Sequence, residues 1–218
     1  MRTLFTFSAT LSLSLGLVVA SALTGCGGAP ADNTANKGTT DTQHDADYPA
    51  GPYGYTQGSV VSDYKFLGKT PTATDVYSAL PLRDLYLGEF HTDTTMRYLL
   101  VVGSANWCIY CNQEAPTVEK LATKYKDQGF RALTVLAEGH TRGEPAIESD
   151  IADWVDAHQF INTDMAIDPA ETLFKYADAS AFPLHILLDT KTMSIEWLCV
   201  GGSPGCDSET AVAQALAK

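Results

Sequence analysis

The chain has 218 residues, of which 45% are hydrophobic and 18% charged, so it can bury one substantial core and carry a tail but is too short for two full domains. Lys and Arg number 14 against 26 Asp and Glu, which gives a formal net charge of −12. A surface field of this sign repels a phosphate backbone, so nucleic acid is excluded as an expected partner.

The first 25 residues have the pattern of a secretory signal peptide. A basic residue, Arg2, precedes an apolar run over residues 4–22 that is relieved only by Thr, Ser and Gly. We therefore expect residues 1–25 to be removed from the mature protein. One alternative is an uncleaved membrane helix. The other is an ordinary signal peptide, which is cleaved but leaves no lipid on the cysteine that follows.

Residues 23–26 have the sequence Leu-Thr-Gly-Cys, which resembles the lipobox of bacterial lipoproteins. The resemblance implies that the Cys26 thiol takes a diacylglycerol and that several acyl chains hold the mature N-terminus at a membrane. The next residue is Gly27 rather than Asp, and in Gram-negative lipoproteins this absence of a retention signal favours the outer membrane. We expect a lipid-anchored protein of the bacterial cell envelope that faces the periplasm.

The segment after Cys26 has no apolar period up to about residue 48, so it cannot offset the entropy of ordering. The aromatic, turn-rich run over 48–55 is expected to lie over the domain as an ordered lead-in. We predict a lipidated flexible tether and lead-in over 26–58 and a folded domain over 59–218.

Apolar patterning in the rest of the chain alternates between strand and helix periods, which predicts an α/β domain. The predicted strands are 59–68, 80–86, 97–103, 130–137, 164–168, 184–188 and 194–200, and the predicted helices are 108–129, 151–158, 169–176 and 208–217. The first two strands can pair as an added N-terminal β-hairpin, and the last two can pair across a turn. A central mixed sheet with helices on both faces follows.

Two cysteines, Cys108 and Cys111, lie where a buried strand and its loop meet the start of a helix. The peptide dipoles and free N–H groups of a first helical turn stabilise a thiolate, lowering the pKa of the first cysteine from about 8.5 into the range of roughly 3.5 to 7.5. Cys108 is therefore the expected nucleophile. Cys111, one helical turn further on, is expected to resolve a mixed disulfide.

The residues around this pair resemble the active site of thioredoxin-like proteins, especially the TlpA/ResA-like thiol-disulfide oxidoreductases of the redoxin (AhpC/TSA) superfamily. Trp107 precedes the first cysteine, Pro116 stands where the family kinks its active-site helix, and Phe182-Pro183 leads into a strand. The resemblance implies a thioredoxin fold and a cis peptide bond at Pro183. It also implies a substrate groove bordered by Trp107, Phe182 and Pro183.

Departures from the family leave part of the chemistry open. Six residues before the first cysteine many relatives have a buried polar residue that assists proton transfer at the second thiol, but this chain has Val102. Water or a nearby group such as Glu114 is then needed. The dipeptide between the cysteines is Ile109-Tyr110, without the common proline, so reductase, oxidase and isomerase all remain open.

Cys199 and Cys206 form the remaining pair, and in an oxidising compartment we expect them to form a structural disulfide. The alternative is a second redox pair that relays electrons to the first. His185, two residues after Pro183, is the histidine that the implied fold places near the site, and we expect it to be a packed core residue.

The expected function is an envelope thiol-disulfide oxidoreductase that acts on thiol- or disulfide-bearing proteins. The resemblance implies a membrane electron donor of the thioredoxin-reducing type, and we expect no cofactor and no metal. A zinc site would need a second cysteine pair at ligand spacing. A peroxiredoxin would need Thr or Ser in place of Ala105, and a Sco-like copper metallochaperone has its cysteines one residue further apart. A lipid-anchored binding module with an inactive site is the remaining alternative.

Overall fold

The computed structural model describes residues 48–69, 78–82, 96–176, 180–202 and 205–218. The predicted signal peptide, the lipobox with Cys26 and most of the predicted tether lie outside these ranges. Within them, every helix is too short or too polar to cross a membrane.

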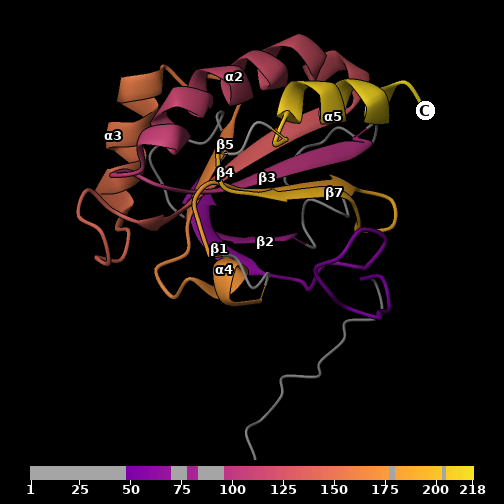
Figure 1. The fold of residues 1–218 in the computed structure, drawn as a ribbon, viewed down its shortest axis with the longest axis horizontal. Coiled ribbons are helices and arrows are strands. Elements are labelled where there is room, and N and C mark those ends of the chain that lie inside the picture. The colour runs from indigo at the N-terminus through magenta and orange to yellow at the C-terminus, as the bar shows by residue number, and fades with distance from the viewer. Residues whose placement is uncertain (1–47, 70–77, 83–95, 177–179, 203–204) are drawn as a thin grey trace, which may run out of the picture. The chain divides into compact units, whose positions relative to one another are not determined.

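In the described part of the chain, seven strands form one mixed sheet in the order β2-β1-β5-β4-β3-β6-β7 (Figure 1). The strands are β1 (Lys65–Lys69), β2 (Ser78–Pro81), β3 (Tyr98–Ala105), β4 (Phe130–Glu138), β5 (Asp164–Ile167), β6 (Leu184–Asp189) and β7 (Ser194–Val200). The mixed α/β architecture with a thioredoxin fold, predicted from the sequence, is confirmed.

Strand β3 is an internal strand of the sheet, parallel to its neighbour β4 and antiparallel to its neighbour β6. All eight of its residues are buried, as expected for an apolar run covered on both faces. The predicted N-terminal hairpin is present, since β1 and β2 pair antiparallel, and the last two strands, β6 and β7, are also antiparallel. The predicted first strand starts later than expected, at Lys65, because Ser59 and Val61 bond to the edge of the sheet instead.

Helices cover both faces of the sheet, as predicted (Figure 1). The helices are α2 (Ile109–Tyr125), α3 (Glu148–His158), α4 (Thr172–Tyr176) and α5 (Ser208–Leu216), with a short 3-10 helix over Lys126–Gln128. Two apolar clusters join α2, α3 and α5 to one face, while α4 packs in a third cluster on the other. Gly129 ends the turn after α2 with a φ of 80°, a conformation that favours glycine.

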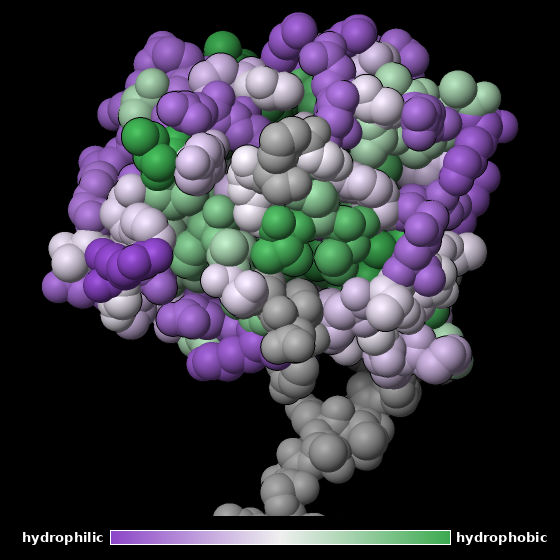
Figure 2. Space-filling view, in the orientation of Figure 1, coloured by the Kyte–Doolittle hydropathy of each residue, from purple (hydrophilic) through white to green (hydrophobic). Residues whose placement is uncertain are grey.

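Residues 48–61, which include the predicted lead-in over 48–55 and are called the lead-in from here on, pack against β7 and continue the sheet locally. The Val61 amide donates to the Met193 carbonyl at 2.9 Å, and the Tyr48 hydroxyl donates to the Val61 carbonyl at 3.0 Å. Tyr48 and Val61 are both buried in the main core. Beyond this covered stretch, Figure 2 shows apolar surface over β7, where Leu198 and Val200 are half-buried.

Candidate active site

Cys108 and Cys111 form a disulfide at the start of α2, with Cα atoms 5.3 Å apart. Cys108 is the N-cap residue of the helix, and its sulfur accepts a hydrogen bond from the Cys111 amide at 3.1 Å. The first turn of α2 contains no acidic residue that would oppose a negative charge. This position stabilises a thiolate on Cys108 in the reduced state.

Asn112 fixes the loop that carries the cysteines. Its side-chain amide donates to the Asn106 carbonyl at 2.9 Å and to the Cys108 carbonyl at 2.8 Å. Its carbonyl oxygen lies 3.1 Å from Nε2 of His158 at the end of α3. The role of Asn112 could not be predicted from the sequence, because a lone asparagine on a helix carries no recognisable signal.

Trp107 forms one wall of the site. Its indole N–H donates to the Glu138 carboxylate at 2.5 Å, and its ring meets the Phe182 ring edge to face at 5.8 Å. The Arg142 guanidinium lies 4.5 Å from the centre of the same ring. Phe182 and Trp107 both pack against the apolar cluster that contains the two cysteines, so four of the predicted groove and redox residues lie together.

The peptide bond between Phe182 and Pro183 is cis, as the resemblance implied. The Pro183 carbonyl accepts a hydrogen bond from the Gly201 amide at 2.7 Å. Gly202, which follows Gly201 in the loop after β7, packs so closely on Tyr110 that a Cβ at this position would lie 2.8 Å from the ring. The loop after β7 therefore contacts both the proline and the dipeptide between the cysteines.

That same loop is closed by a disulfide between Cys199 and Cys206, whose Cα atoms are 5.5 Å apart. Cys199 lies near the end of β7, and Cys206 lies two residues before α5. The bond therefore links a strand to a helix across the segment that touches the site. Its expected role as a structural bond stays a prediction.

Glu114, three residues after Cys111 on α2, and His185 on β6 form a polar pair that could not be recognised from the sequence. The Nε2 atom of His185 lies 2.7 Å from one carboxylate oxygen of Glu114, and the Ser208 hydroxyl donates to the other at 3.2 Å. His185 is buried, as expected of a core residue, but it has an ionisable partner. The signal was hidden because 71 residues separate the two positions.

His140, Asp150 and Asp153 are the group of potential metal ligands found among the described residues, with ligand atoms within 4.8 Å of one another. The two oxygens of Asp150 already accept hydrogen bonds from the Ile147 amide at 2.7 Å and from the Asn106 side chain at 3.0 Å. Asp150 thus caps α3 and holds the loop before the cysteines, so we assign this group a structural role.

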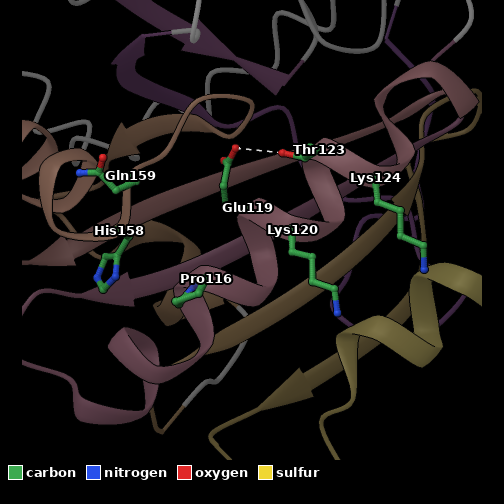
Figure 3. A pocket seen from close by; sticks show the side chains of 7 residues that line it. All are labelled: Pro116, Glu119, Lys120, Thr123, Lys124, His158 and Gln159. Atoms are coloured by element: carbon green, nitrogen blue, oxygen red, sulfur yellow. Dashed lines mark hydrogen bonds between the residues drawn. The ribbon is translucent and has the colours of Figure 1, made fainter.

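A shallow groove between α2 and the end of α3 lies apart from the cysteines, on the outer side of α2 (Figure 3). In this view Glu119 points toward Thr123, and the Lys120 and Lys124 side chains extend away from α2 toward α5, where Lys120 contacts Glu209. The carboxylate of Glu119 is occupied by the amides of Asn162 and Thr163. The groove therefore does not contribute to the redox site.

Comparisons with known proteins agree with this geometry. Residues 83–194 match the model of the AhpC/TSA family, whereas no curated protein matches the sequence. A structure described as a thiol:disulfide interchange protein DsbE from Chlorobium tepidum superposes with a TM-score of 0.55 and 21% identity, covering 74% of this chain and 98% of the other.

Two further structures have the same fold. The thioredoxin domain of a thiol-disulfide oxidoreductase from Bacteroides vulgatus has a TM-score of 0.55 and 19% identity, covering 74% of this chain and 98% of its own. The exposed lipoprotein thioredoxin of Streptococcus pneumoniae has a TM-score of 0.50 and 21% identity, and the match covers 72% of this chain and 98% of the other.

Proposed function

Since the chain belongs to the AhpC/TSA family and is an oxidoreductase of thioredoxin fold, we propose that it exchanges disulfides with protein substrates through Cys108 and Cys111. The observation that carries the proposal is the hydrogen bond from the Cys111 amide to the Cys108 sulfur at the start of α2. It supports a stabilised thiolate at the position of the attacking sulfur.

In the reducing direction, the Cys108 thiolate attacks one sulfur of a substrate disulfide. The substrate S–S bond breaks, a mixed disulfide forms on Cys108, and one substrate thiolate leaves. Cys111 then loses its proton and attacks the Cys108 sulfur. The mixed disulfide breaks, the Cys108–Cys111 bond forms, and the second substrate thiolate leaves, so two electrons have passed to the substrate. The oxidising direction is the reverse.

Exposed apolar side chains around the sulfurs support a protein substrate. Ile109 and Tyr110 are 65% and 57% exposed, although the two cysteines beside them are buried. Trp107 and Phe182 are half-buried next to them. A substrate chain can cover this surface while it presents a disulfide to Cys108, and the apolar area removed from water stabilises the encounter.

A peroxidase, which the family name also covers, is the less favoured candidate. That chemistry needs a hydroxyl from Thr or Ser three residues before the attacking cysteine, and this chain has Ala105, fully buried at the end of β3. We therefore expect the reduced protein to consume hydrogen peroxide no faster than a free dithiol does.

We further propose that the protein acts in the bacterial envelope, attached through a lipid on Cys26 after removal of residues 1–25. The lipobox-like residues 23–26 support this location. Its partners would be thiol- or disulfide-bearing envelope proteins and a membrane donor of electrons. Labelling with a radioactive fatty acid tests the anchor: Cys26→Ser should abolish incorporation, and retained label would contradict the proposal.

The central experiment is the reduction potential of the Cys108–Cys111 couple in glutathione or dithiothreitol buffers, with Cys108→Ser as the inactive control. A value near −270 mV, about that of thioredoxin, would indicate a reductase supplied by a membrane donor, and about −120 mV would indicate an oxidant that introduces disulfides. A pair that does not cycle at all would contradict the proposed function and leave a binding module.

A further inference from the structure

His185 is the most completely buried ionisable side chain near the redox pair. It has no exposed surface, and its Nε2 atom lies 2.7 Å from Oε2 of Glu114, which is 19% exposed. Its other ring nitrogen, Nδ1, is buried without a hydrogen-bond partner. A buried ionisable group with one strong contact and one empty nitrogen calls for a physical explanation.

The empty nitrogen indicates which protonation state the pair adopts. If His185 carried two protons, or if Glu114 held the shared proton, Nδ1–H would be a buried donor with no acceptor, which is costly. If His185 is neutral with its proton on Nε2, Nδ1 is only an unused lone pair. The geometry therefore favours a neutral imidazole that donates to an ionised Glu114.

The pair stands where the chain lacks a polar residue on β3. His185 lies directly opposite Val102 in the β3–β6 register, and directly opposite pairs project to the same face of a sheet. Val102 occupies the position that many thioredoxin-like proteins fill with a polar group. On α2, Glu114 follows Cys111 by three residues, a spacing that brings Cβ atoms to about 5–6 Å.

Few other groups face His185 from the elements around it. Strand β7 presents Cys199, which is opposite His185 and bound in a disulfide, and Trp197, whose ring centre lies 5.7 Å away. Helix α5 presents the Ser208 hydroxyl to the far oxygen of Glu114. Among the described contacts of this region, Glu114 is thus the group that can exchange a proton with water, through its exposed fraction.

We propose that His185 is a positioning residue for the redox reaction: it holds the Glu114 carboxylate ionised and aimed toward Cys111, so that Glu114 takes the proton that Cys111 must lose to resolve the mixed disulfide. The proton passes from the Cys111 sulfur to a carboxylate oxygen of Glu114, directly or across one water, and then to solvent. This inference rests on the proposed disulfide exchange.

The test separates the two steps of that exchange in the purified protein. Reduced protein is mixed with oxidised glutathione, and the release of the first and second glutathione thiols is followed between pH 6 and 8. In the natural protein, transfer to an internal acceptor makes the second step nearly independent of pH. In His185→Leu and in Glu114→Gln, the rate of the second step at pH 6 should be at least about tenfold lower than in the natural protein and should increase about tenfold per pH unit. The rate of the first step should be unchanged.

Three further variants are measured in the same assay. The double variant should be no slower than either single variant, since both act on one contact. His185→Gln, which keeps a donor, should restore the rate to within about twofold. Exposed His140→Gln serves as the matched control and should behave like the natural protein.

A second step with unchanged rate and pH slope in Glu114→Gln, which is partly exposed and so tolerates substitution, would overturn the inference. So would equal slowing of both steps in His185→Leu, because that indicates general disruption of the site. Failure of the natural protein to form any mixed disulfide would instead contradict the proposed function itself.

Discussion

At Gly103, in the second half of β3, the core leaves no room for a side chain. A Cβ there would lie 2.5 Å from the Phe174 ring, which in turn contacts the Phe182 ring at a centroid distance of 4.4 Å. Gly103→Ala should therefore lower the free energy of unfolding by about 1–3 kcal/mol, the usual cost of overpacking. Urea unfolding followed by tryptophan fluorescence measures the change.

A compensating substitution provides the control for this prediction. Phe174→Leu removes ring atoms from the place that the new methyl group needs, so Gly103→Ala combined with Phe174→Leu should lose less stability than the sum of the single changes. Strictly additive losses would show that the close approach of Gly103 and Phe174 does not limit this part of the core.

Several site residues could be predicted from the sequence because each carries a local signal. Cys108 and Cys111 have a diagnostic spacing, and Trp107 and Phe182 flank recognisable positions. His185 was predicted to be a core residue, and its burial agrees with that. Its contact with Glu114 could not be predicted, because it depends on where α2 packs on the face of the sheet relative to β6. Sequence spacing does not encode that position.

Helix α2 is tied to the segment after α3 by one carboxylate. Glu119 accepts hydrogen bonds from the Asn162 amide at 2.9 Å and from the Thr163 hydroxyl at 2.7 Å, among others. Glu119→Ala should cost about 2 kcal/mol of stability, because hydrogen bonds to a charged acceptor are lost and backbone donors are left without a partner. Denaturant unfolding measures this loss of stability, with Glu148→Ala at an exposed position as the control. Equal effects of the two substitutions would contradict the role of Glu119 in linking α2 to the segment after α3.

The end of α3 makes stability depend on pH. Burial lowers the pKa of His158 below its usual 6.5 because the charged form is disfavoured. As pH falls through 6.5, the unfolded chain therefore binds a proton before the folded chain does, and stability decreases. The urea concentration at the unfolding midpoint should decrease when the pH is lowered from 7.5 to 5.5. His158→Gln, which retains a donor for Asn112, should make that decrease smaller. An unchanged fall would exclude His158 as a source.

The type and order of the elements could be predicted, but some of their ends could not. Strand β3 begins with a continuous apolar run and β6 is apolar except at His185 and Asp189, while the period of three and four residues marks α2. The first strand was predicted to start too early, at residue 59. Val60 and Val61 fit a strand pattern, but the pattern does not say whether they belong to β1 or pair with another strand. In the fold they bridge to the β7 edge, a choice that only tertiary packing makes.

The lead-in is part of the packed molecule as a whole, since it covers the first half of the β7 edge and buries Tyr48 and Val61. Deleting residues 48–61 from the chain should cost at least about 3 kcal/mol, the value of two large buried side chains, and should expose an unpaired strand edge. Thermal unfolding and light scattering measure both effects. A deletion of equal length at 27–40, in the predicted tether, should change neither; equal behaviour would contradict the role of the lead-in.

The loop between Cys199 and Cys206 touches Pro183 on one side and Tyr110 on the other, so the two disulfides of the domain share a boundary. A fully reduced domain would hold four electrons, two in each couple. Because linkage is reciprocal, reducing the first disulfide must shift the midpoint potential of the second in the same direction as reducing the second shifts that of the first. With two electrons in each couple, the two midpoints must shift one another by the same number of millivolts.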